Sequence, residues 1–317
     1  MLNKTKDIIN EVGKAVIGKD EVIKKVLTAI LAGGHILLED VPGVGKTTLA
    51  LSFSKVLGID YKRVQFTTDT MPSDIVGFSL YNKSENRFVY QQGPVMTNLL
   101  LADEINRTSS KTQAALLEVM EEKRVTVDGE TYELPDPFVV IATQNPVGSA
   151  GTQLLPSSQL DRFMIRLSMG YPDFKSQVNI LKDRHHENPL DNINQIITVD
   201  ELKEMQKMCE NVYVADEIYE YITRLCSGTR EHKMVDLGIS PRGAIAVCRL
   251  AKSTAFIDGR DYVLPQDVSE VFCDVAAHRL VLNRKARING LSQESIAQDV
   301  MSIVEMPKIK VKMGNRL

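Results

Sequence analysis

Short apolar runs alternate with amphipathic segments through the first half of the chain. Five runs have the length and continuity of buried strands: 35–38, 64–67, 99–103, 139–143 and 163–167. Three segments between them have helical patterns: 47–57, 109–123 and 157–161. Parallel strands covered on both faces are continuously apolar rather than alternating. The pattern therefore predicts an α/β fold, a doubly wound parallel sheet with helices on both faces.

The strand pattern stops after Pro172, and amphipathic helical patterns follow. They cover 174–186, 200–210, 215–228, 241–257 and 265–283. Pro241 and Pro265 would lie in the first turn of their helices, where proline is well tolerated. We expect an α/β domain over residues 1–180 and a smaller all-helical domain over residues 181–317.

Two segments interrupt the α/β pattern. Residues 71–98 separate the second and third predicted strands and contain an extended stretch, 86–94. Residues 124–134 predict a β-hairpin, because Asp128-Gly129 favours a type I′ turn. That turn would place Arg124 opposite Glu133 and Thr126 opposite Thr131, a favourable set of cross-strand pairs.

Composition narrows the class of protein. The 317 residues are 43% hydrophobic and 25% charged, as in ordinary globular proteins, and 38 basic residues nearly balance 41 acidic ones. A net charge of −3 gives no global attraction to nucleic acid. The cysteines and histidines lack metal-ligand spacing. The sequence has neither a secretion signal nor an apolar run of roughly 18 residues, so we expect a cytoplasmic protein without a membrane span.

A phosphate-binding loop is predicted where the first strand leads into the first helix. Its nucleotide-binding residues would be Pro42, Gly43, Val44, Gly45, Lys46, Thr47 and Thr48. Such a loop turns backbone N–H groups toward an anion, places a lysine on the β- and γ-phosphates and a threonine hydroxyl on Mg²⁺. A Gly/Pro turn without a ligand is the alternative.

Asp40 departs from the loop pattern G-x-x-x-x-G-K-[ST], which has glycine at this first position. Aspartate adopts left-handed backbone more readily than most residues, which is one way to accommodate it. Its carboxylate would also have to point away from the phosphates.

Polar side chains end two further apolar strands. Asp103 and Glu104 follow 99–102, and Asn145 follows 139–143. At the carboxyl edge of a parallel sheet, Asp103 would hold Mg²⁺ through water, while Glu104 would align and deprotonate the water that attacks the γ-phosphate. Asn145 would reach that water or the γ-phosphate, unless Asn145-Pro146 is only a turn.

In combination, these segments resemble the MoxR family of AAA+ ATPases. The resemblance covers about residues 10 to 305, with the motifs in the family's order. It is carried by residues 39–47, 103–122, 142–146, 159–163 and 240–242. In this family the first glycine of the loop is often lost, which makes Asp40 an expected variation.

The resemblance implies roles for two arginines that the residues alone leave open. Arg162 would be an arginine finger that reaches the γ-phosphate held by a neighbouring subunit. Arg242 would be a sensor of the γ-phosphate, acting in cis or in trans. The alternatives are a surface salt bridge for Arg162 and a solvent contact for Arg242. Arg107 is a secondary candidate for the subunit interface, and Gly243 stands where relatives usually have alanine.

The resemblance also implies a function. A ring-shaped homo-oligomer, a hexamer, would bind ATP and Mg²⁺ and use hydrolysis to remodel or activate client proteins, including proteins with a von Willebrand factor A domain. The two interrupting segments would project toward the pore of the ring. Tyr81, Phe88 and Tyr90 would then contact a client or, alternatively, pack locally.

Two other functions compete with this one. A nucleic-acid-dependent AAA+ motor would use the same projecting segments, but the predicted turn at Asp128-Gly129 is acidic and lacks the basic side chains that bind phosphates. A nucleotide switch that does not hydrolyse ATP would have no need of Glu104 and Asn145.

Overall fold

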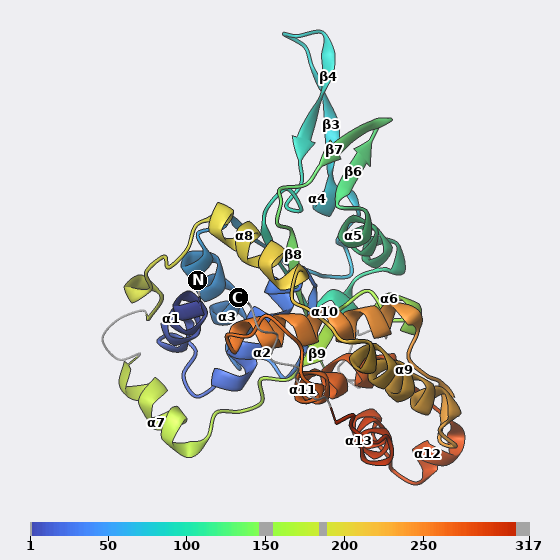
Figure 1. The fold of residues 1–317 in the computed structure, drawn as a ribbon. Coiled ribbons are helices and arrows are strands. Elements are labelled where there is room, and N and C mark those ends of the chain that lie inside the picture. Colours follow the sequence, from blue (N-terminus) through green and yellow to red (C-terminus); the bar gives the residue numbers. More distant parts are fainter. Residues whose placement is uncertain (1, 146–154, 184–188, 309–317) are drawn as a thin grey trace, which may run out of the picture. The chain divides into compact units, whose positions relative to one another are not determined.

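The computed structural model describes residues 2–145, 155–183 and 189–308 (Figure 1). The chain divides into two compact units, Met1–Lys207 and Met208–Leu317. The predicted boundary after residue 180 falls inside the first unit. Helix α8 (Val199–Glu210) accounts for this difference, because Gln206 Nε2 donates to the carbonyl of Ile30 at 2.7 Å and Lys4 pairs with Glu201.

The first unit contains the predicted parallel sheet. Its strands lie in the order β2-β5-β8-β1-β9, and all of them are parallel. Their bounds are β1 (Ile36–Glu39), β2 (Tyr61–Gln65), β5 (Leu99–Asp103), β8 (Val139–Gln144) and β9 (Ile165–Leu167). Every residue of β5 is buried, as are the first five of β8, which explains their continuous apolar sequences.

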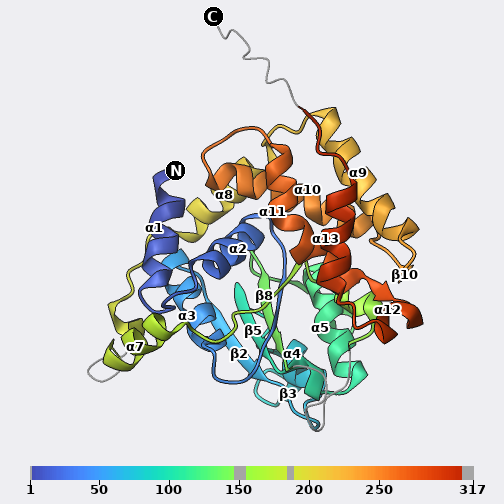
Figure 2. The same ribbon diagram turned by 90° about the horizontal axis from the view of Figure 1, so that it is seen from below.

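Helices cover both faces of this sheet, as predicted. Helices α1 to α3 lie on one side of the strands and α5 on the other (Figure 2). Leu37, Leu100 and Val140 of the sheet pack with Leu116 and Met120 of α5 in one buried cluster. The helical segments are α1 (Leu2–Gly13), α2 (Asp20–Leu31), α3 (Lys46–Leu57), α4 (Ser73–Val76), η1 (Ile105–Arg107), α5 (Ser110–Glu122), α6 (Ser157–Leu160), α7 (Phe174–Asp183) and η2 (Pro189–Asn192).

The two segments that interrupt the α/β pattern each form a β-hairpin. The hairpins are β3 (Gly77–Asn82) with β4 (Arg87–Gln92), and β6 (Arg124–Val127) with β7 (Glu130–Glu133). Arg124 pairs with Glu133 and Thr126 with Thr131, which confirms the predicted register. The turn residues Asp128 and Gly129 have φ values of 50° and 84°, as a type I′ turn requires. Both hairpins project from the sheet in one direction (Figure 1).

The second unit is a helical lid that also contains a short antiparallel ribbon. Its elements are α9 (Asp216–Glu231), β10 (Val235–Leu237), α10 (Pro241–Ile257), α11 (Pro265–Ala276), η3 (Ala277–Arg279), β11 (Val281–Leu282), α12 (Arg284–Ile288) and α13 (Gln293–Ile303). The helix predicted over 265–283 therefore ends early. Residues after η3 extend to pair β11 with β10, and Asn283 then caps α12 by accepting from Ala286 N at 2.9 Å.

Across the described ranges, no helix is both long enough and apolar enough to cross a membrane.

His35 joins three elements at the start of β1. Its Nδ1 accepts from the backbone N–H of Val140 on β8, and its Nε2 donates to the carbonyl of Met120 on α5, both at 3.0 Å. Burial, aided by the nearby charge of Lys123 and opposed by the bond to Met120, lowers the pKa of His35 from 6.5 to about 4. The imidazole is therefore neutral in the folded protein at pH 7.

We expect His35 to make stability depend on pH. Between pH 6.5 and pH 4 the unfolded chain binds a proton that the folded chain does not, so stability falls as pH falls through this window. From pH 7 to pH 5 the loss should be about 2 kcal/mol in the free energy of unfolding. Urea unfolding of the wild type and of His35→Gln at both pH values measures it. An equal pH dependence in the two proteins would contradict the assignment.

Candidate functional site

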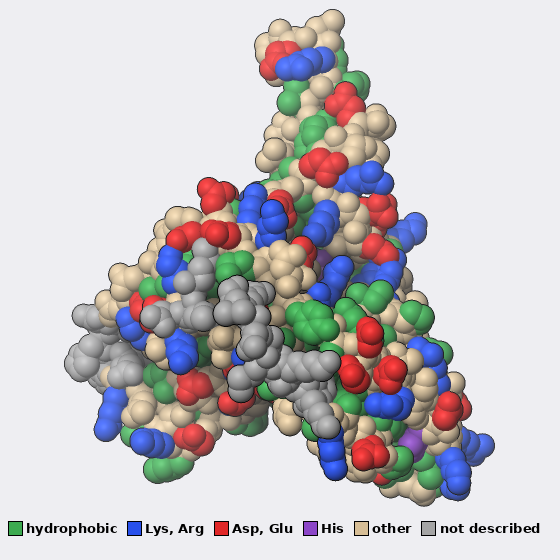
Figure 3. Space-filling model, in the orientation of Figure 1, with side chains coloured by type: hydrophobic (Ala, Val, Ile, Leu, Met, Phe, Trp, Pro, Cys, Tyr) green, Lys and Arg blue, Asp and Glu red, His purple; other side chains and the backbone are tan. Residues whose placement is uncertain are grey.

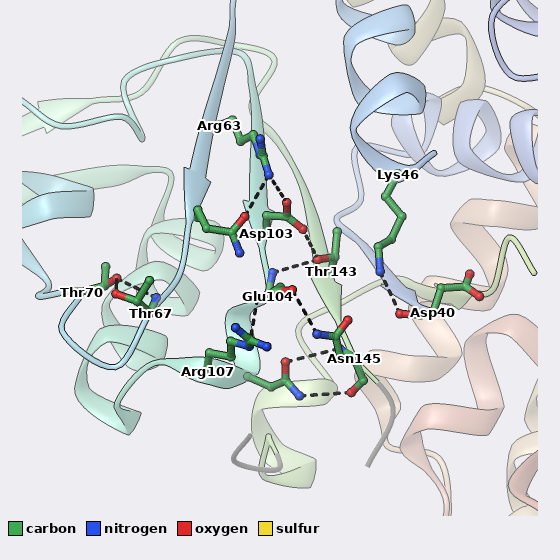
Figure 4. A network of polar contacts seen from close by, with 12 residues as sticks. Asp40, Lys46, Arg63, Thr67, Thr70, Asp103, Glu104, Arg107, Thr143 and Asn145 are labelled. Carbon is green, nitrogen blue, oxygen red and sulfur yellow. Dashed lines mark hydrogen bonds and ion pairs between the residues drawn. The ribbon is translucent and has the colours of Figure 1, made fainter. Parts of the chain in front are cut away.

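The candidate site lies where strands β1, β5 and β8 end. These strands are neighbours in the sheet and parallel, so their carboxyl ends share one edge. The residues that follow them are the loop beginning at Asp40, the pair Asp103-Glu104, and Asn145 (Figure 4). The structure thus brings together three motifs that the sequence predicted separately.

Two glycines give the loop its shape. Gly43 and Gly45 have φ values of 86° and 99°, in the left-handed region that favours glycine. A Cβ on Gly43 would meet no atom within 4 Å, so backbone conformation rather than space requires glycine there. Gly45 caps α3 and provides no side-chain acceptor for the first turn. The N–H groups of that turn are therefore suited to bind an anion.

Lys46 is held by the carbonyls of its own loop. Its Nζ donates to the carbonyl of Asp40 at 2.9 Å and to that of Val41 at 3.4 Å. Burial lowers the pKa of Lys46, whereas the charges of Asp40, Asp103 and Glu104 raise it. The Lys46 amino group thus lies against the loop carbonyls and feels the charges of both acidic residues.

Both carboxylate oxygens of Asp103 have donors. Thr143 Oγ1 donates to Oδ1 at 2.6 Å, and Arg63 Nη2 donates to Oδ2 at 2.6 Å. The Thr143 hydroxyl also accepts from Glu104 N at 2.8 Å, so it fixes both acidic residues. Arg63 and Thr143 were not predicted as site residues. A threonine in an otherwise apolar buried strand was a usable signal, but nothing in the sequence pointed to Arg63.

Glu104 and Asn145 are hydrogen-bonded to each other, and one acceptor atom of Asn145 has no partner among the described residues. Asn145 Nδ2 donates to Glu104 Oε1 at 3.1 Å, and Arg107 Nε lies 3.0 Å from Glu104 Oε2. Asn106 exchanges two hydrogen bonds with the backbone of Asn145 and so fixes its position. Within the described residues, Asn145 Oδ1 is buried and has no hydrogen-bond partner. Such an oxygen is suited to accept from a bound water.

Of the arginines that the resemblance singled out, Arg162 lies outside this network. Arg162 Nη1 donates to the carbonyl of Leu117 at 2.7 Å and pairs with Glu121 at 2.8 Å, both on α5. Arg107, by contrast, belongs to the network through Glu104. Arg242 lies in the other unit, in the first turn of α10, where the N-cap residue Ser240 accepts a hydrogen bond from Gly243 N.

Close packing explains why glycine, rather than alanine, occupies position 243 next to Arg242. A Cβ at this position would lie 2.5 Å from Ile239 Cγ2 and 2.9 Å from Arg279 Cδ. Alanine would therefore require these side chains to move. Although glycine weakens the first turn of a helix, here it allows Ile239 and Arg279 to pack closely against α10.

A small, largely apolar pocket lies beside the loop. Three segments line it: the connection between α1 and α2, the start of α3, and the region of α7. Its residues are Ala15, Val16, Ile17, Lys19, Val44, Gly45, Thr48, Pro172 and Ile180. The pocket was not predicted from the sequence, because its walls are distant along the chain.

The donors present fit a nucleoside triphosphate with a divalent cation. Backbone N–H groups and Lys46 suit the phosphates, while Thr47 and Asp103 offer the oxygen ligands that Mg²⁺ prefers. The open Asn145 Oδ1, beside Glu104, suits a water molecule. The arrangement can therefore bind a phosphate chain and hold a water next to a carboxylate.

Comparisons with known proteins agree with this geometry. Residues 35–165 match the model of the ATPase family associated with various cellular activities (AAA), and residues 227–300 match an AAA lid domain. Chaperone MoxR1 of Mycobacterium tuberculosis is 38% identical over 95% of this chain and 82% of its own length. The chain belongs to the MoxR family of AAA+ ATPases. The family predicted from the sequence is thereby confirmed.

Other MoxR-like proteins match along most of their length. Protein MoxR of Methylorubrum extorquens is 30% identical over 86% of both chains. The uncharacterized protein YeaC of Bacillus subtilis is 45% identical over 94% of this chain and 93% of its own. The crystal structure of an ATPase candidate from Cytophaga hutchinsonii is 39% identical, covers 97% of this chain and 96% of its own, and has a TM-score of 0.90. The MoxR-family fold therefore extends over both units.

Proposed function

We propose that this MoxR-family protein hydrolyses ATP with Mg²⁺ and uses the reaction to remodel or activate client proteins. The observation that carries the proposal is the open Asn145 Oδ1 beside the carboxylate of Glu104, at the same sheet edge as Lys46. A site that only binds nucleotide has no use for a fixed carboxylate beside an unpartnered amide oxygen.

In this proposal, each group of the site has one task. The loop N–H groups and Lys46 bind the phosphates, and Thr47 and Asp103 hold Mg²⁺, which neutralises phosphate charge when bound. Asn145 Oδ1 accepts a hydrogen bond from the attacking water and orients it. Glu104 takes a proton from that water while the water oxygen forms a bond to the γ-phosphorus. The bond between the γ-phosphorus and the oxygen that bridges it to the β-phosphate breaks, which leaves ADP and phosphate.

A single subunit is short of positive charge for this reaction. In the described network the cations are Lys46, Arg63 and Arg107, and the last two are already paired with Asp103 and Glu104. Charge that develops on the transferred phosphoryl group therefore needs a further cation. We propose that Arg162 supplies it to the neighbouring subunit in a hexameric ring, and that Arg242 senses the γ-phosphate from the lid.

The projecting hairpins are the proposed client contacts. Phe88 is 69% exposed and Tyr81 46% exposed, and their rings meet edge to face at 5.4 Å. Tyr90 differs, because it stacks on Tyr132 at 4.2 Å and so joins the two hairpins. Hydrophobic side chains lie among charged ones along the projection (Figure 3). Tyr81 and Phe88 are thus better placed than Tyr90 to contact a client, and a von Willebrand factor A domain protein is the proposed partner.

The nucleic-acid motor has less support. The tip of the β6-β7 hairpin is Asp128-Gly129, and β7 carries two exposed glutamates, Glu130 and Glu133. These charges repel a phosphate backbone. That nucleic acid is not a partner, and that the protein acts in the cytoplasm, stay predictions.

Replacing Glu104 with Gln should separate binding from hydrolysis. Glutamine keeps the size of the side chain but cannot take the proton of the attacking water. We expect ATP to bind as in the wild type and steady-state ATPase turnover to fall by about 100-fold or more. A phosphate-release assay and a binding titration measure the two quantities.

Glu204→Gln is the matched control, since Glu204 is an exposed acid on α8. It should change neither binding nor turnover. Wild-type turnover in Glu104→Gln would rule out the water-activating role of Glu104, and no ATPase activity in the wild type would count against the proposed reaction.

Arg162→Ala and Lys46→Ala should complement each other if Arg162 acts in trans. Each variant alone should lose activity, by about 10³-fold for Arg162→Ala. In randomly mixed rings, about a quarter of the sites would combine an intact Lys46 with an intact Arg162 from the neighbour. The ATPase activity of the mixture should therefore rise to about a quarter of the wild-type activity.

Glu121→Gln provides the control for the contact within one subunit. It removes the observed ion pair with Arg162 but leaves the arginine in place, so it should retain activity. Mixed rings that are no more active than the separate variants would contradict action in trans.

A further inference from the structure

Asp40 stands where the phosphate-loop pattern has its first glycine, yet its side chain is fully engaged. Only 7% of the residue is exposed. Its carboxylate accepts from Ser168 Oγ at 3.1 Å, from Met169 N, and from Gly170 N at 3.2 Å. Its carbonyl accepts from Lys46, while its carboxylate points away from that lysine (Figure 4). This orientation agrees with the expectation that the carboxylate points away from the phosphates, which stays a prediction.

The backbone of Asp40 is not left-handed. Among the described residues, the non-glycine positions with positive φ are Asn86, Glu104, Lys123 and Asp128. Left-handed backbone is therefore not the way in which the loop accommodates Asp40. Aspartate is explained by what its side chain binds, not by what its backbone tolerates.

The bonds of Asp40 continue the sheet beyond its backbone ladder. The register of β1 and β9 ends with the pair Leu38 and Leu167. Arg166 of β9 then pairs with Glu39 at 3.0 Å, and Asp40 binds the three residues after β9. The start of the phosphate loop is thus attached to segment 168–170 by charge-assisted hydrogen bonds.

This attachment joins two walls of the pocket beside the loop. One wall is Val44, Gly45 and Thr48, which follow Asp40 directly. A second part of the lining is Pro172 and Ile180, which come after segment 168–170 in the chain. A glycine at position 40 would leave the N–H groups of Met169 and Gly170 without this acceptor, and Met169 is buried. The hydrogen bonds that tie the start of the loop to segment 168–170 would then be lost.

We infer that Asp40 is a positioning residue for nucleotide binding. This inference rests on the proposed ATP site and adds a role at its first loop position. Asp40 holds the phosphate loop against segment 168–170, so that loop and pocket are already in place when nucleotide enters. Its effect falls on binding rather than on the chemical step, because its carboxylate points away from Lys46 and from the site of reaction.

The decisive variant is Asp40→Gly, which restores the glycine of the usual pattern. It should weaken binding of a non-hydrolysable ATP analogue and raise KM for ATP by about tenfold, the loss of preorganisation being of the order of one charge-assisted hydrogen bond. At saturating ATP, kcat should stay within about twofold of the wild type. Titration calorimetry, steady-state kinetics and thermal melting without nucleotide measure these effects.

Two further variants keep the test decisive. Asp40→Asn retains one acceptor oxygen and should weaken binding less than Asp40→Gly, but measurably. Ser168→Ala removes one donor and leaves both backbone donors, so it should bind ATP nearly as the wild type does. If Asp40→Gly does not fold, the affinity of Asp40→Asn for the ATP analogue provides the test. An Asp40→Asn protein that binds the analogue as tightly as the wild type would overturn the inference.

Failure of this inference differs from failure of the proposed function. Wild-type affinity and KM in Asp40→Gly, with or without a lower melting temperature, would overturn the positioning role and leave the ATP site standing. A roughly tenfold fall in kcat with no change in KM would also overturn the positioning role. Absence of ATP binding in the wild type would overturn the proposed function and this inference with it.

Discussion

The parallel pairing of β5, β8 and β1 is the constraint on which the site depends. Because these strands are adjacent and point the same way, the residues that follow them meet at one edge. Asp40, Asp103 and Asn145 each lie just beyond or at the last residue of one strand. A slip of one strand by a single residue would turn its terminal side chain to the opposite face of the sheet. The buried apolar register thus fixes the chemistry.

The acidic groups at this edge are already partnered by the protein. Asp103 accepts from Thr143 and Arg63, and Glu104 is bound by Asn145 and Arg107. These contacts stabilise two neighbouring carboxylates in a largely buried place, where unpaired charges would be costly. In the proposed reaction, Mg²⁺ and the attacking water would therefore bind to side chains that the protein already holds in place. Asn145 Oδ1 is the acceptor in it that is buried without a partner among the described residues.

What the sequence predicted were features encoded locally. The loop, the strands that carry Asp103 and Asn145, and the register of the hairpin from Arg124 to Glu133 each follow from residues close in the chain. The missed features depend on distant residues. Arg63 meets Asp103 through strand pairing, Asp40 meets segment 168–170 across β1 and β9, and β11 breaks the predicted last long helix by pairing with β10.

Titration of the wild type and of Lys46→Ala with a fluorescent ATP analogue, in the presence of Mg²⁺, tests the central claim that this edge is a nucleotide-phosphate site. Because Lys46 is the proposed cation for the phosphates, we expect the wild type to bind and Lys46→Ala to bind at least about tenfold more weakly, with an unchanged melting temperature in the absence of nucleotide. Equal affinity in the two folded proteins, or no binding by the wild type, would contradict the account.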